Sequence, residues 1–253
     1  MKNRDFKLSS VLIIQVIMTL IIFLLGKIFN VSSIDETYAE PSLLYSILSM
    51  LIYIVTNFIV AYGLLSNKMG SVSDYMKGIR VINPRNFSLS LVVNIIPTIA
   101  VLLFGAGISS LITNSILLGK YSQTGTITTS LIIVILLSMI YYVFTAYQYF
   151  IIADAANMSF SKLFKKIFVV GKDMAAKTIK LFLKWIVLPI VIYLVLIIAL
   201  FSSTSQGNVG AIVFASILSI VFVVYILIAY ANFLNQLSLN YIDYKNKFDN
   251  KLI

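Results

Sequence analysis

The 253-residue chain offers few side chains that could do chemistry. It contains neither cysteine nor histidine, which excludes thiolate nucleophiles, imidazole bases and the ligands of nearly every zinc, haem or copper site. Neither a Gly-x-Ser-x-Gly nucleophile motif nor a Walker A phosphate-binding loop is present. We therefore predict a protein that is not an enzyme and that has no catalytic, cofactor-binding or metal-binding residues.

Asp154 is the candidate carboxylate. It lies in the segment Ile151-Ile-Ala-Asp-Ala-Ala-Asn157, at the inner end of a long apolar run. A carboxylate in this place could bind a proton or a cation, or pair with one of the lysines that follow. It could also accept backbone N–H bonds as a helix cap at the level of the lipid headgroups. We favour the cap, because Asp154 lies outside the bilayer midplane.

Uncharged polar side chains recur at four-residue spacing within several apolar runs, which places them on one face of a helix. They would either form hydrogen bonds between helices, the commoner use of Asn, Gln and Thr in membrane bundles, or line a hydrated substrate path. We favour hydrogen bonding between helices and keep both interpretations. The candidates are Asn57, Asn94, Thr98, Gln148, Asn232 and Asn235, together with the carboxylate Asp154.

The elements that carry these residues are predicted to be membrane-spanning helices. The chain is 60% apolar and only 11% charged, with a mean hydropathy of +1.00, which is too few charges for a water-soluble globule. A bilayer core of about 30 Å requires about 20 apolar helical residues. Six segments of a single membrane domain (1–253) meet this length: 8–28, 43–65, 88–115, 128–153, 185–203 and 209–238.

The placement of the basic residues, which give the chain a net charge of +10, predicts its orientation in the membrane. Of nineteen Lys and Arg residues, only Lys27 and Lys120 fall on one side of the six spans. The other seventeen lie in the two termini and in the second-to-third and fourth-to-fifth connections, which we predict to be cytoplasmic. The basic charge is thus explained by topology and by possible contact with anionic lipid headgroups. A nucleic-acid partner is not expected, because no basic segment forms a soluble fold of its own.

Two cytoplasmic connections, 71–81 and 159–182, are predicted to be interfacial amphipathic helices. Apolar residues of the second recur every three or four positions and lysines occupy its other faces. Its lysines are candidates for contact with lipid phosphate or a protein partner; an alternative is a solvated elbow that leads into the next span. These lysines are Lys162, Lys165, Lys166, Lys172, Lys177 and Lys180.

The same two connections share a pattern, Ser-x-Ser-x-x-apolar-Lys-x-Ile-x-Val, which begins at Ser71 and at Ser159. An Ala-Tyr pair precedes each connection, and a proline lies in each span that follows. Both units run in the same direction through the membrane. This indicates a weak parallel internal repeat of helix, interfacial helix and helix.

The residues Tyr149-Phe-Ile-Ile-Ala-Asp154 and Lys165-Lys-Ile-Phe-Val-Val-Gly171 resemble a poorly characterised family of six-span membrane proteins of Gram-positive bacteria. That family is similar to the membrane-anchor domain of some glycerophosphodiester phosphodiesterases. The resemblance covers about 40 residues, from Tyr147 to Trp185. It implies six helices and cytoplasmic ends, but no catalysis, since the phosphodiesterase domain has no counterpart here.

Three functions are compatible with these features. The leading hypothesis is a non-enzymatic multi-pass plasma-membrane protein that serves as a transport-related component or as a membrane accessory factor in an envelope process. An immunity or stress protein that protects the membrane from pore-forming peptides is the alternative. A membrane-embedded enzyme that acts on lipid, with Asp154 at its chemistry, is a further alternative.

Overall fold

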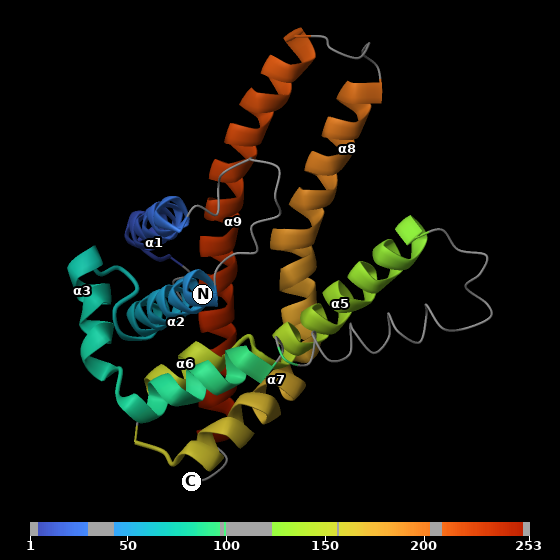
Figure 1. Cartoon of the computed structure of the whole chain (residues 1–253). Coiled ribbons are helices and arrows are strands. Elements are labelled where there is room, and N and C mark those ends of the chain that lie inside the picture. Colours follow the sequence, from blue (N-terminus) through green and yellow to red (C-terminus); the bar gives the residue numbers. More distant parts are fainter. Residues whose placement is uncertain are drawn as a thin grey trace, which may run out of the picture. The chain divides into compact units, whose positions relative to one another are not determined.

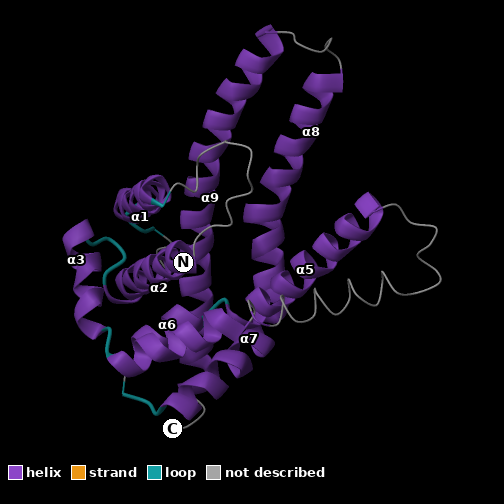
Figure 2. Cartoon of the chain, in the orientation of Figure 1, coloured by secondary structure: helices purple, strands orange, loops and turns teal. Residues whose placement is uncertain are grey.

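The structure is a computed structural model that describes residues 5–29, 43–96, 99, 123–155, 157–202 and 209–249. Within these ranges every regular element is a helix, and the helices are joined by short loops (Figure 2). The all-helical fold predicted from the continuous apolar runs is confirmed for this part of the chain.

Five helical segments are long and apolar enough to cross a membrane. They comprise α1 (Leu8–Ile28), α2 (Leu43–Ser66), part of α5 (Gln123–Thr145) together with α6 (Gln148–Asp154), a continuous run from Phe160 to Ser202, and α9 (Val209–Asp249). The predicted third span, 88–115, lies mostly outside the described residues; its first part belongs to a helix over 84–96.

The described chain divides into two compact units. The first comprises residues 1–81 and 176–253, and its core lies where α1 and α2 pack against each other and against α9. Figure 1 shows α1 and α2 beside the lower part of α9. Buried side chains at this junction include Val11, Ile14, Ile54, Phe58 and Phe233.

The other part of α9 pairs with α8 (Leu188–Ser202), and the two helices run side by side in Figure 1. Apolar side chains on both helices are exposed, among them Ile198 and Ile220. A helix that is apolar on all sides is typical of a membrane span. At about 1.5 Å per residue, the 41 residues of α9 extend about 60 Å, so only about half of this helix fits within a bilayer core of about 30 Å.

A π-helical turn, η3 (Leu183–Val187), joins α8 to α7 (Phe160–Phe182). Within it the Leu188 N–H donates to the Leu183 carbonyl, five residues back. Pro189 follows, and proline lacks an N–H and clashes with the carbonyl four residues earlier in a regular helix. The wider turn is a usual way to absorb such a proline without breaking the helix.

The second unit, residues 82–175, contains the helix over 84–96, α5, α6 and the first part of α7. Ala146 and Tyr147 form a turn that separates α5 from α6, within what the sequence suggested was one continuous span. At Gly171 the backbone of α7 lies directly against the Phe144 backbone of α5. A Cβ at Gly171 would lie 2.6 Å from the carbonyl carbon of Phe144 and would overlap its carbonyl oxygen.

The contact at Gly171 predicts a large cost for a single methyl group. Because backbone atoms of Phe144 are in the way, Gly171→Ala should lower the free energy of unfolding by about 1–3 kcal/mol. Thermal unfolding in detergent micelles, followed by circular dichroism, measures this loss.

Gly26→Ala is the matched control, because its added methyl would lie 3.7 Å from Tyr45, an ordinary contact distance. Because alanine has a higher helix propensity than glycine, we expect no loss in the free energy of unfolding for this control. Equal stability of the two variants would contradict the close approach of α7 to α5.

Candidate functional site

The most distinctive surface of the chain is the basic face of α7. Its buried residues, Leu163, Ile167, Val170, Met174 and Thr178, recur every three or four positions, so they share one side of the helix. The remaining sides carry six lysines, all at least partly exposed: Lys162, Lys165, Lys166, Lys172, Lys177 and Lys180. We name these six residues the lysine face.

The buried side of α7 packs inside the protein. Gly171 contacts Phe144, and the Phe168 ring meets the Tyr141 ring of α5 edge-on, with 6.2 Å between centroids. Leu163 and Ile167 are completely buried. This differs from the expectation that the apolar side of the 159–182 segment rests in the headgroup layer, because protein covers most of it. The lysine face remains available to an outside partner.

Three of the four segments predicted to be cytoplasmic meet in the first unit. The Lys7 N–H donates to the Lys68 carbonyl (2.9 Å), and the Ser10 hydroxyl donates to the Gly70 carbonyl (2.8 Å). These bonds fix the start of α1 to the loop that follows α2. Partial burial lowers the pKa of Lys68, and the Asp243 carboxylate on α9 opposes this shift. The chain start, the 67–70 loop and the end of α9 thus lie together.

The connection over 71–81 forms a short α-helix, α3 (Val72–Met76), and a 3-10 helix, η1 (Lys77–Val81). Ser71 and Asp74 form a capping box in which each side chain accepts the other residue's N–H. The Lys77 ammonium, 2.7 Å away, and the bonds from Ser71 lower the pKa of Asp74 to about 2. Asp74 therefore stays ionised at neutral pH.

Tyr75 of α3 anchors this connection. Its ring is completely buried on Gly63 of α2, where a Cβ would overlap it. Its hydroxyl donates to the Lys68 carbonyl (3.1 Å), and burial raises the pKa of Tyr75 to about 12. In turn, Gly78 of η1 lies close to the Tyr62 side chain of α2. The connection is therefore fixed to α2 by two reciprocal glycine–tyrosine contacts.

The two connections of the proposed repeat are alike only at their start. Ser71 and Ser159 each immediately precede a helix, and Tyr75 and Leu163, four residues further on, are both completely buried. After that, α3 passes into η1, whereas α7 continues as one α-helix of 23 residues. The internal repeat stays a prediction.

Asn57 links two helices of the first unit. Its amide N–H donates to the Tyr53 carbonyl one turn earlier (2.8 Å), and its side-chain oxygen accepts the Tyr230 hydroxyl of α9 (3.3 Å). Tyr53 joins the cluster through side-chain hydrogen bonds with both residues. This is the role in helix contacts that we favoured for Asn57.

Asn94 has the corresponding place in the second unit. Its amide lies 2.7 Å from the Ser90 carbonyl and 3.1 Å from the Tyr149 hydroxyl of α6. Asn86 and Ser90 precede it at four-residue spacing and are almost completely buried; the side-chain polar atoms of Asn86 and the Ser90 hydroxyl have no hydrogen-bond partner within the described part. Such groups ordinarily hold ordered water. Neither residue was among the candidates predicted from the sequence, although the same four-residue spacing indicates both.

The other candidates lie on α6 and α9 or outside the described residues. Gln148 begins α6 and is buried, and Asn235 is buried in α9. Asn232 donates to the Ile228 carbonyl within its own helix (2.9 Å). Asp154 is exposed at the last residue of α6, several residues before α7 begins. Thr98 lies outside the described residues. Contacts within each unit therefore favour helix packing for Asn57 and Asn94.

Among the residues that the structure describes, no cluster of three or more Asp or Glu side chains could hold a metal ion. Comparison of the chain with protein-family models, with curated proteins and with solved structures found no match. The resemblance to the membrane-anchor family therefore rests on the residues between Tyr147 and Trp185 alone.

The bond between Asn57 and Tyr230 generates a prediction about helix association. In a double-mutant cycle, Asn57→Ala and Tyr230→Phe should show a coupling energy of about 0.6 kcal/mol, typical of hydrogen bonds between membrane helices. Unfolding in detergent measures the stability of both single variants and of the double variant.

Ser216→Ala provides the control pair with Tyr230→Phe, because Ser216 bonds only to the Ile212 carbonyl of its own helix among the described contacts. The losses of stability caused by Ser216→Ala and Tyr230→Phe should add in the double variant. Additivity for Asn57 and Tyr230 as well would remove the proposed helix-linking role.

Proposed function

We propose that this chain is a multi-pass protein of the plasma membrane of a Gram-positive bacterium, which acts without catalysis as a transport-related component in an envelope process. In this proposal the lysine face docks an acidic surface of a cytoplasmic ATPase subunit. The observation that carries the proposal is the division of α7 into a side covered by the protein and a side of exposed lysines.

This division of α7 matters because the residues that stabilise the fold differ from the lysines that we propose bind a partner. A helix whose apolar side already packs against α5 at Gly171 and Phe168 does not need a partner to cover it. Its lysines contribute little to folding, since exposed charges stabilise a fold only weakly. Six lysines against one exposed carboxylate, Asp173, instead give α7 a net positive charge, which attracts an anionic surface over about a Debye length, about 8 Å at physiological salt.

The contacts around Lys68 support the proposed orientation. Charged residues are excluded from the bilayer core, and Lys7, Lys68 and Asp243 lie together in the first unit. Three basic segments that the charge pattern assigned to the cytoplasm therefore lie near one another. We propose that both termini and the lysine face are cytoplasmic.

Purification of the full chain from its own membranes in mild detergent tests the proposal. An ATPase subunit should be recovered with it, and recovery should fall as the salt concentration rises. Lys165 and Lys172 are two turns apart on the lysine face and both are exposed. The double variant Lys165→Gln/Lys172→Gln should lower the affinity by up to about thirtyfold, at about 1 kcal/mol for each lost ion pair.

The matched control is Lys7→Gln/Lys247→Gln, which removes the same charge from two exposed positions outside α7. It should leave recovery of the ATPase unchanged. Repeated purification without any ATPase, or an equal loss in the control variant, would overturn the proposal.

A further inference from the structure

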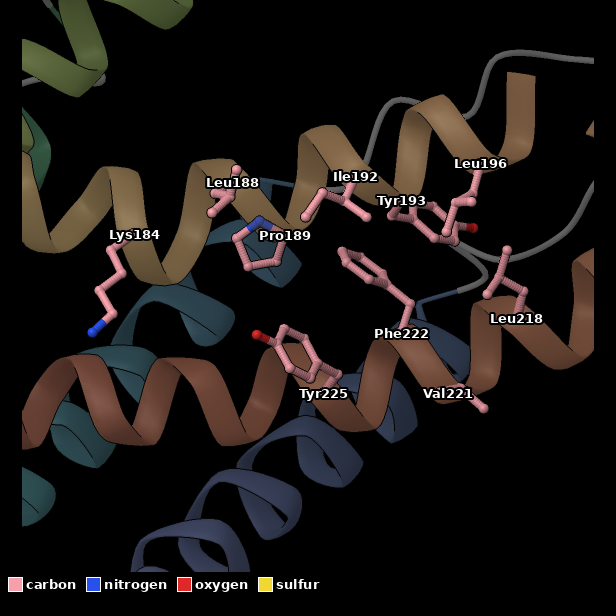
Figure 3. Close-up of a pocket in the computed structure, with 10 residues that line it drawn as sticks. All are labelled: Lys184, Leu188, Pro189, Ile192, Tyr193, Leu196, Leu218, Val221, Phe222 and Tyr225. Atoms are coloured by element: carbon pink, nitrogen blue, oxygen red, sulfur yellow. The ribbon is translucent and has the colours of Figure 1, made fainter. Parts of the chain in front are cut away.

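A groove between α8 and α9 has a polarity that matches a phospholipid. It lies within the first unit, has a volume of about 280 Å³, and is bordered by η3 and α8 on one side and α9 on the other (Figure 3). Nine of its ten lining residues carry no charge, and the tenth is Lys184. We infer that this groove binds one acyl chain of an anionic phospholipid whose phosphate lies at Lys184.

Two aromatic rings hold the helices together along the groove. Tyr193 of α8 stacks on Phe222 of α9 with 4.1 Å between ring centroids. The Tyr193 hydroxyl also lies 2.8 Å from the Ser219 hydroxyl, within hydrogen-bond distance. These contacts fix the separation of the two helices beside the groove, so its apolar surface is built into the hairpin.

The charge of the groove is confined to one end. Figure 3 shows the Lys184 ammonium at one end, and Leu196, Leu218 and the uncharged Tyr193 hydroxyl at the other. From Lys184 to Leu196 the helix rises about 18 Å at about 1.5 Å per residue. This is close to the depth of one leaflet, about half of the bilayer core of about 30 Å. The groove therefore changes from cationic to uncharged and largely apolar over the same distance as a membrane lipid.

The volume of the groove favours a single acyl chain as its occupant. Pockets for small molecules usually measure about 300–1,000 Å³, so 280 Å³ accommodates a slender apolar group and not a whole lipid. An ammonium binds phosphate as a point charge. Phosphatidylglycerol offers that phosphate, and its headgroup carries no cationic group that would compete with Lys184. The surrounding apolar side chains of α8 and α9 are exposed, as expected where lipid covers a span.

This inference rests on the proposed orientation, which places Lys184 in the cytoplasmic leaflet, where anionic lipid is enriched. It does not depend on an ATPase partner. The lysine face and the groove use different residues, so each can fail without the other.

The single tryptophan of the chain, Trp185, provides a local probe. It is adjacent to Lys184, whose ammonium lies 5.0 Å from the centre of its ring. Brominated acyl chains quench tryptophan fluorescence on contact. The full chain is reconstituted in phosphatidylcholine vesicles with a fixed fraction of phosphatidylglycerol, and bromine is placed on an equal amount of one lipid or the other.

Brominated phosphatidylglycerol should quench Trp185 at least twofold more strongly than brominated phosphatidylcholine. Lys184→Gln should abolish this preference, whereas Lys172→Gln, an exposed lysine of α7, should retain it. The Lys165→Gln/Lys172→Gln variant should also retain it, which separates this test from that of the ATPase partner.

A second pair of variants tests the apolar part of the groove. Val221 lines it and Val224 does not, although their exposed fractions are similar, 58% and 55%. Val221→Phe should fill the groove and weaken quenching by brominated phosphatidylglycerol, and Val224→Phe should not.

Three results would overturn the inference. Equal quenching by the two lipids would indicate only general lipid contact. An unchanged preference in Lys184→Gln would remove the phosphate site. Absence of quenching by both lipids, with quenching restored as the protein is diluted in the membrane, would show that a second copy of the chain occupies the groove.

Discussion

The exclusion of charge from hydrocarbon is the constraint on which the rest of this structure depends. Long apolar helices satisfy their own backbone hydrogen bonds and can lie in lipid, but a lysine on them must reach an interface. The apolar hairpin of α8 and α9 and the basic segments at its Lys184 end both follow from this cost. The contacts of Lys68 with Lys7 and Asp243 show that widely separated basic segments meet in the folded chain.

The packing of α7 depends on a residue that carries no side chain. Gly171 allows the backbone of α7 to approach Phe144, and this contact places Ile167 and Met174 in the interior. With one side covered, the lysines are among the residues of α7 that are at least partly exposed, together with Val169, Asp173 and Ile179. Under the proposed function, a structural role and a binding role thus belong to different sides of one helix.

The sequence predicted much of this fold because apolar length and charge position are local properties. The predicted bounds of the spans at 8–28 and 43–65 agree with α1 and α2 to within one residue. The turn at Ala146 and Tyr147 was not foreseen, because the apolar pattern continues across it. The length of α9 was not foreseen, because the apolar run ends near residue 238 while the helix continues through charged residues to Asp249. The periodicity of 159–182 indicated an apolar side, of which Leu163, Ile167, Val170 and Met174 are buried but Phe160 is exposed. It did not indicate what covers that side, since protein interior and lipid favour the same side chains. The polar spacing indicated Asn57 and Asn94, whereas their partners, Tyr230 and Tyr149, required the tertiary structure.

The central claim is that the lysine face lies on the cytoplasmic side of the membrane. Since the chain has no cysteine, single cysteines can be introduced and labelled without background. The most direct measurement is labelling of Lys172→Cys and Lys120→Cys in intact cells with a maleimide that does not cross membranes. The account predicts that Lys120→Cys is labelled in intact cells and Lys172→Cys only after lysis. Labelling of Lys172→Cys in intact cells would contradict it.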